Sequence, residues 1–208
     1  GMTALARLAV VGLCALIAGC SSVPLGTMWK LSRMGPEAIL EANPVDVRAA
    51  VRSHRRLLDV EGFAKGKLYV GVQSETLGDR DWWFSLEDVS AVDALRLERP
   101  APDQRWRVYR VAAEQLSEFQ SMQRQLTTLI EQFDTMEGEN SLSLRVSFPR
   151  ESWLEAIDSL SGDPSGSFDL KIDYRVDLQL DAADGFFTLL RDDAFDLRPI
   201  LEYGNDDL

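Results

Sequence analysis

The chain has little of the residue types that most metal and nucleophilic sites need. Its 208 residues include one histidine, His54, and two cysteines, Cys14 and Cys20. Zinc sites favour imidazole nitrogen and thiolate sulfur, so this supply excludes a zinc site built by the protein. His54 lies among arginines, which disfavour the charged form that a general base must adopt. We expect no metal and no cofactor, and a histidine that is exposed or in a loop.

Motifs for hydrolysis and phosphate binding are also missing. The sequence contains no G-x-S-x-G, no second histidine and no glycine loop that could hold a phosphate. Glu87 and Asp88 are adjacent, and neighbours on a strand point to opposite faces. A glycosidase with two carboxylates stays open, because its acids can lie far apart in the chain. A hydrolase acting on the cell wall is therefore the third hypothesis, and we expect a protein that is not an enzyme.

Positive charge is scarce. Lys and Arg number 22 against 34 Asp and Glu, a net charge of −12, which argues against nucleic-acid binding. The C-terminal part is the most acidic. The spacing of its aspartates does not match the EF-hand loop, and aspartates on an exposed strand also prevent association between sheets. Those that could donate oxygen to calcium are Asp181, Asp184, Asp192, Asp193 and Asp196. We expect no metal there.

A long hydrophobic run is missing too. The N-terminal apolar run extends from Leu8 to Ile17, whereas a transmembrane helix needs roughly 20 apolar residues. Arg7 precedes the run and small residues follow it up to Cys20, an arrangement typical of a secretory signal peptide. Gly1, ahead of Met2, is typical of a residue added by cloning and plays no part in the argument.

The ending Ile17-Ala18-Gly19-Cys20 resembles the lipobox of bacterial lipoproteins, a resemblance that covers only the leader. It implies that residues 1–19 are removed and that Cys20 carries a thioether-linked diacylglycerol and an acylated amine, palmitate being the usual label. Cys20 would then be the only cysteine of the mature chain, in an oxidising compartment where a structural thiol is expected to have a partner. Ser21 in place of Asp implies sorting to the outer membrane. The alternative is an incidental small residue at the end of an ordinary signal peptide.

Residues 20–35 are small, polar and proline- or glycine-containing, as expected of a tether, and residues 36–208 are enough for one domain. Alternation of apolar and polar residues predicts strands, the clearest being Phe168–Leu180, where even positions are apolar and odd positions polar. Other strands are predicted at residues 29–32, 56–60, 66–73, 82–87, 105–111, 142–148 and 186–190, the last after a turn at Asp184-Gly185.

Three helices are expected. Asn43-Pro44 is typical of a helix start and predicts a helix to about Ser53. A period of three and four predicts a long helix from Ala113 to Met136, and a short one follows at Glu151–Leu160. The expected fold class is α+β, an antiparallel sheet of about six to eight strands with one long α-helix packed across it and one or two short helices.

Two groups of residues are candidate contact sites. Trp82 and Trp83 would point to opposite sides of a strand, and the exposed ring could contact a protein, glycan or lipid partner. In the helix expected from Pro44, Arg48, Arg52 and Arg55 would share one side and could contact anionic headgroups. The alternative is that these arginines pair with acids of the same domain, those after Phe168 among them, or are simply solvated.

The function favoured by these observations is that of an accessory protein of the bacterial envelope, anchored by acylated Cys20 and facing the periplasm. It would bind or assemble a protein partner without catalysis. The alternative is a carrier that holds an apolar ligand or lipid between helix and sheet. A carrier purified from membranes should retain lipid beyond its own anchor, which separates the two hypotheses.

Overall fold

The structure, a computed structural model, describes residues 37–75, 78–133, 140–162 and 170–202. The leader, Cys20, the tether, the strand expected at residues 29–32 and the last six residues lie outside the described residues. So do the ends of two predicted elements, residues 134–136 and 168–169.

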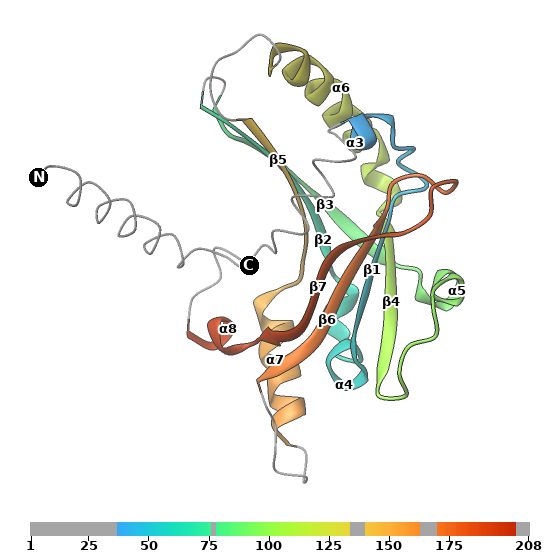
Figure 1. Cartoon of the computed structure of the whole chain (residues 1–208), viewed down its shortest axis with the longest axis vertical. Helices are drawn as coiled ribbons and strands as arrows, with labels where there is room; N and C mark the ends of the chain where they lie inside the picture. The colour runs from blue at the N-terminus through green and yellow to red at the C-terminus, as the bar shows by residue number, and fades with distance from the viewer. Residues whose placement is uncertain (1–36, 76–77, 134–139, 163–169, 203–208) are drawn as a thin grey trace, which may run out of the picture.

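Seven antiparallel strands form one sheet in the order β5-β2-β3-β4-β1-β6-β7 (Figure 1). The strands are β1 (Arg48–His54), β2 (Lys67–Ser74), β3 (Arg80–Asp88), β4 (Gln104–Val111), β5 (Asn140–Ser147), β6 (Lys171–Gln179) and β7 (Phe187–Asp196). The α+β class and the antiparallel sheet predicted from the alternating pattern are confirmed. So is the turn before β7, where Gly185 has the positive φ that glycine adopts without strain.

The helices are α3 (Glu37–Glu41), α4 (Arg55–Leu58), α5 (Ser90–Asp93), α6 (Leu116–Phe133), α7 (Arg150–Ser161) and α8 (Arg198–Glu202). Short 3-10 turns are η1 (Glu61–Ala64), η2 (Ala94–Arg96) and η3 (Ala113–Gln115). The long helix predicted from Ala113 corresponds to η3 followed by α6, and the helix predicted at Glu151–Leu160 corresponds to α7. In Figure 1, α6 lies near one end of the sheet and α7 near the other.

The sheet changes partners along β3. The first part of β3 pairs with β2, from Val72 opposite Arg80 to Lys67 opposite Ser85. Only its last three residues pair with β4, where Leu86 lies opposite Val111. Because one strand belongs to two ladders in succession, the strands β5 and β2 diverge from β4, β1, β6 and β7, and the sheet curls at β3 (Figure 1).

One face of the curled sheet, here called the core face, carries the hydrophobic core. Helix α6 places Phe119, Met122 and Leu126 on it with no exposed surface, and Phe119 contacts Phe84 with ring centroids 5.0 Å apart. At the other end, Phe63 packs against Phe148 and Trp153 at centroid distances of 4.9 and 5.0 Å. Full burial of each such side chain contributes about 1.5–3 kcal/mol, so both ends of the core stabilise the sheet.

On the opposite face, here called the outer face, the described residues form a small second cluster. Ala50, Trp106 and Val108 are buried there under partly buried residues of the segment that contains α5 and η2. On the strands β5, β2 and β3, by contrast, the outer face retains exposed side chains, namely Lys67, Gln73, Trp83, Ser85, Ser141 and Ser143.

The helix predicted from Asn43-Pro44 is wrong. Asn43 instead closes a turn, since its side-chain oxygen accepts a hydrogen bond from the Val45 N–H at 3.3 Å and its carbonyl accepts one from Asp46 at 2.8 Å. Strand β1 follows at Arg48 and lies between β4 and β6. The preference of Asn43 for a helix N-terminus is a local effect. The pairing of β1 with β4 on one side and β6 on the other outweighs it.

The strand predicted at residues 56–60 is wrong as well. Leu57 and Leu58 are consecutive and both fully buried in α4, which a half-exposed strand does not allow. His54 precedes this helix, and its Nδ1 accepts a hydrogen bond from the Arg56 N–H at 3.2 Å. His54 is the last residue of β1 and is partly buried, so the expectation of an exposed or loop histidine is wrong.

The alternation along β6 is confirmed on its apolar side and needs correction on its polar side. Ile172, Tyr174, Val176 and Leu178 are buried in the core. At the end of the strand, however, the outer-face residues Asp177 and Gln179 are also buried. The Gln179 amide donates to the Asp46 carbonyl at 2.8 Å, so this position belongs to the packed structure and is not a solvated site.

Candidate functional site

An aromatic and cationic cluster lies on the open part of the outer face. Tyr69 on β2 is opposite Trp83 on β3 in one ladder and opposite Arg145 on β5 in the next. The three residues therefore form one row across three strands, and we call them the outer-face cluster. The cluster forms because the odd-numbered side chains of β2, β3 and β5 all point away from the core.

The two rings and the guanidinium are in contact. The ring centroids of Tyr69 and Trp83 are 4.7 Å apart at an interplanar angle of 59°. The Arg145 guanidinium carbon lies 4.6 Å from the Tyr69 centroid and 5.6 Å from that of Trp83. Such cation–π contacts are worth about 0.5–1 kcal/mol each at exposed sites and more when desolvated. The cluster is therefore a preformed surface whose side chains have little freedom left to lose.

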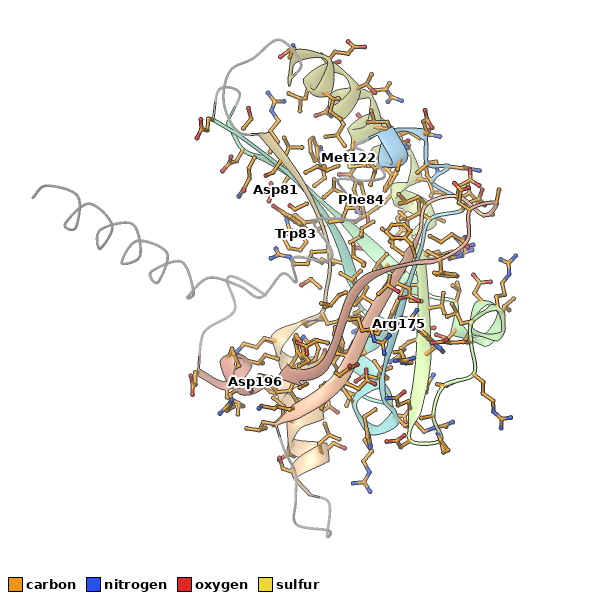
Figure 2. The ribbon with its side chains drawn as sticks, in the orientation of Figure 1. Asp81, Trp83, Phe84, Met122, Arg175 and Asp196 are labelled. Atoms are coloured by element: carbon orange, nitrogen blue, oxygen red, sulfur yellow. The ribbon has the colours of Figure 1, made fainter. Side chains whose placement is uncertain are left out.

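Trp83 is the accessible member of the cluster. The residue is 39% exposed, and its indole N–H donates to Asp81 at 3.3 Å. Trp82 packs against the core, so the prediction that the two tryptophans point to opposite sides is confirmed. In Figure 2, Trp83 and Phe84 likewise lie on opposite sides of the strands.

The charge of Arg145 is not neutralised by the described residues. Among them, no carboxylate lies within ion-pair distance of Arg145, and its buried Nε has no hydrogen-bond partner. The cluster therefore offers a flat indole on which a group can stack, beside a guanidinium that can bind an anion through its N–H donors.

A glycine makes room for this arrangement. Gly71 lies two residues along β2 from Tyr69, and the Tyr69 ring leans over it. A Cβ placed on Gly71 would come within 2.3 Å of the Tyr69 hydroxyl oxygen. A glycine inside a strand often marks such a close approach.

Sequence reasoning identified Trp83 but missed Tyr69 and Arg145. Their positions on the polar side of predicted strands were visible in the sequence. The order of the strands, which brings these three residues into one row, was not.

A second cluster lies on the outer face at β1, β4 and β6. The guanidinium carbons of Arg52 and Arg175 are 5.5 and 5.4 Å from the Trp106 ring centroid, and both arginines contact Glu98, at 2.9 and 2.8 Å. Arg175 also forms two hydrogen bonds with Asp177. An open cavity of about 350 Å³ lies beside this cluster, between Arg96–Glu98 and Ala182–Phe186.

This second cluster does not offer a free cation. Arg52 has a further acid, Asp173, at 3.6 Å, so each of its two arginines contacts two carboxylates. The hydrogen bonds to Asp177 raise the pKa of the Arg175 guanidinium above its usual value. The cluster is a paired network that holds β1, β4 and β6 together.

The arginines proposed to contact a membrane do not share one side of a helix. Arg48 and Arg52 lie on β1, and Arg55 begins α4. Arg48 pairs with Asp93 at 2.7 Å, and Arg55 donates to the Pro102 carbonyl at 3.0 Å. The alternative, pairing with acids of the same domain, is confirmed for Arg48 and Arg52. One of the partners, Asp173, belongs to the acidic part after Phe168.

Among the described residues of the acidic C-terminal part, three aspartates accept hydrogen bonds from residues two positions further along the chain. Asp181 and Asp192 accept hydrogen bonds from the N–H groups of Ala183 and Ala194, at 2.7 and 2.9 Å. Hydrogen bonds from Arg198 lower the pKa of Asp196 to about 2. Among the described residues, no group of three His, Cys, Asp or Glu side chains could hold a metal ion. Within those same residues no helix is long and apolar enough to span a membrane.

Comparisons of the chain with protein-family models, with curated proteins and with solved structures gave no match.

Proposed function

We propose that this chain is a non-catalytic binding protein of the bacterial envelope, and that the outer-face cluster of Tyr69, Trp83 and Arg145 is where its partner docks. The observation that carries the proposal is an exposed indole held beside a guanidinium that no described carboxylate neutralises. Tryptophan and arginine are enriched among the residues that dominate protein interfaces. A partner surface with an apolar side chain beside a carboxylate fits this chemistry.

The rigidity of the cluster supports the same proposal. Binding costs about 0.5–1.5 kcal/mol for each rotamer-rich side chain that it immobilises. Arg145 is already held by two rings, and Trp83 is held by Tyr69 and Asp81. A partner therefore meets side chains that are largely ordered in advance.

The carrier hypothesis has less support. A carrier would hold its ligand between the long helix and the sheet, and among the described residues Phe84, Phe119 and Met122 fill this space with no exposed surface. The cavity described beside Arg175 is lined partly by charged residues, namely Arg96, Glu98, Arg175 and Asp177, and lies on the other face.

The location of the protein forms the second part of the proposal. The ending Ile17–Cys20 supports lipidation of Cys20 and attachment to the outer membrane, with the domain facing the periplasm. Metabolic labelling with palmitate tests this part. The wild type should incorporate label and Cys20→Ser should not, and label that persists in Cys20→Ser would contradict it.

Site-specific photo-crosslinking in the producing bacterium tests the docking surface. A photoreactive residue in place of Ser85, which is exposed on β3 two residues from Trp83, should crosslink to one partner protein. The matched control carries the photoreactive residue at Val92, which is 71% exposed on α5. In the Ser85 background, Trp83→Ala and Arg145→Ala should each abolish the crosslink. A crosslink that survives both substitutions, or appears equally from Val92, would refute the docking site.

A further inference from the structure

The open cavity of about 350 Å³ on the outer face, here called the outer cavity, is formed by three parts of the chain. Residues 96–98, which complete η2 and follow it, form one wall, and the turn at residues 182–186 forms another. The sheet contributes Trp106 on β4 and residues of β6, among them Arg175. In Figure 2, Arg175 and Trp83 lie on different parts of the sheet, so the outer cavity is separate from the outer-face cluster. Pockets for small molecules measure roughly 300–1,000 Å³, so this one fits a small ligand.

The outer cavity contains a cation that no described carboxylate neutralises. Arg96 is exposed, and no acid of the described ranges lies within ion-pair distance of it. Arg175, the other cation of the lining, forms two hydrogen bonds with Asp177. A guanidinium binds a carboxylate through two parallel N–H donors, so Arg96 can bind a carboxylate that comes from outside the chain.

Glu98 has one carboxylate oxygen left for a donor. The Nη1 groups of Arg52 and Arg175 both donate to its Oε1, at 2.9 and 2.8 Å. In the part of the chain that the structure describes, its Oε2 accepts no hydrogen bond, and the side chain is 58% exposed. A carboxylate oxygen accepts more than one hydrogen bond, so Oε2 can accept one from an ammonium group.

The charges of the lining balance each other. The cations are Arg96 and Arg175, and the carboxylates are those of Glu98 and Asp177. A ligand with a net charge would leave one charge in the cavity without a partner, which costs free energy where water is partly excluded. A ligand that carries one charge of each sign avoids this cost.

Part of the wall is apolar. Leu97 and Phe186 are partly buried and pack against the small cluster that contains Trp106. The residues Ala182 and Gly185 of the turn have little or no side chain, which leaves space between the walls. An apolar group of a ligand that covers Leu97 and Phe186 removes apolar surface from water on both sides.

We propose that the outer cavity binds a free amino acid with an apolar side chain. Its carboxylate contacts Arg96, its ammonium group contacts Oε2 of Glu98, and its side chain covers Leu97 and Phe186. The two charges of a free amino acid are attached to one carbon atom, and Arg96 and Glu98 lie two residues apart in one wall. A fatty acid or a peptide terminus brings only one of the two charges. This inference does not rest on the proposed function, because it uses no residue of the outer-face cluster.

The wall that carries both charged groups is held in place. The Trp106 indole N–H donates to the Glu98 carbonyl at 3.0 Å, and the Leu97 N–H donates to the Ala94 carbonyl at 3.3 Å. A wall that is ordered in advance reduces the cost of binding, whereas an open cavity covers only part of a small ligand. We therefore expect a Kd of about 0.1–1 mM.

NMR titration of the full chain in detergent micelles tests the inference, with L-phenylalanine and L-leucine as probes up to about 20 mM. The indole N–H signal of Trp106 reports on the outer cavity, and that of Trp83 reports on the outer-face cluster. N-acetyl-L-phenylalanine lacks the ammonium group and L-phenylalanine amide lacks the carboxylate. Each of these two analogues should bind at least tenfold more weakly than L-phenylalanine.

The variant Arg96→Gln removes the carboxylate contact and should weaken binding at least tenfold. Arg99→Gln is the matched control, since Arg99 is also exposed, forms no ion pair with a described residue and does not line the cavity. It should leave binding unchanged.

A saturable shift of the Trp106 signal that is weakened in Arg96→Gln, kept in Arg99→Gln and weakened for both analogues supports the inference. Four results overturn it: no shift with either amino acid, equal effects of the two arginine variants, an analogue that binds as well as L-phenylalanine, or a shift of the Trp83 signal in place of that of Trp106. The last result would place the ligand on the outer-face cluster.

Discussion

Arg175 and Asp177 are neighbours on the outer face of β6 and join through two hydrogen bonds, Nε to Oδ1 at 2.7 Å and Nη2 to Oδ2 at 2.9 Å. Residues two apart on a strand point to the same face, so no other element is needed to bring them together. Asp177 is buried, with 4% of its side chain exposed. Two residues that the sequence pattern places on a solvated strand face therefore form an ion pair whose carboxylate is buried and whose guanidinium is partly exposed.

Removing one partner of this pair should destabilise the fold. Breaking a buried pair costs about 3–5 kcal/mol, and Asp177→Ala should fall near 3 kcal/mol because Arg175 keeps Glu98. Asp193→Ala is the matched control, since Asp193 and its partner Arg191 are 75% and 61% exposed. Its effect should stay within about 0.5 kcal/mol in urea titrations. Equal losses in the two variants would mean that Asp177 is solvated.

Asp88, at the end of β3, should make stability depend on acid pH. Partial burial by itself raises the pKa of this carboxyl, but hydrogen bonds from Ser90 and Arg107 outweigh burial and hold the pKa below its usual 3.8. Because the folded-state pKa is depressed, the contribution to stability is complete above about pH 4 and is lost as pH falls through the folded value.

The variant Asp88→Asn isolates this contribution. The unfolding free energy of the wild type should fall more steeply between about pH 4 and pH 2 than that of Asp88→Asn, with the two slopes alike above about pH 5. Urea titrations at each pH measure the slopes. Parallel profiles over the whole range would show that Asp88 titrates at its unfolded value.

The two faces of β6 should differ in their tolerance of truncation. Leu178→Ala removes a fully buried side chain and should cost about 2–5 kcal/mol. Lys171→Ala changes an exposed position of the same strand and should stay within about 0.5 kcal/mol. Gln179 lies on the polar face of β6, but Gln179→Ala should still cost about 1–3 kcal/mol, because the wild-type amide donates to the Asp46 carbonyl. A Gln179→Ala variant as stable as Lys171→Ala would contradict the buried hydrogen bond.

Gly71→Ala should disturb the outer-face cluster with little effect on stability. The new Cβ would displace the Tyr69 ring, whose nearest atoms belong to the movable end of a side chain. The change in unfolding free energy should stay below about 1 kcal/mol. The NMR signal of the Trp83 indole N–H should shift, because the ring beside it moves. The control is Gly162→Ala after α7, where the atoms nearest to the new Cβ lie 3.7 and 3.9 Å away. An unchanged indole signal in Gly71→Ala would refute the contact.

Much of the secondary structure could be predicted from local pattern. The period of two in β2, β3, β4, β5 and β6 identified these strands, and the period of three and four identified α6. These predictions succeeded because each apolar side chain faces a core that lies on one side of its own element, so the pattern is set by residues close in sequence. The two elements that failed, residues 44–53 and 56–60, have competing local signals.

The sequence by itself determined which side chains point away from the core on each strand, including Tyr69, Trp83 and Arg145. Only the tertiary structure decided that these three form one row, because the order β5-β2-β3 joins residues far apart in the chain. The tertiary structure also decided that Arg48 and Arg52 form ion pairs and not a solvated basic face, because β1 lies between β4 and β6. Parity is a local property of the extended backbone, whereas strand order depends on long-range pairing, and the contacts of the candidate site come from the latter.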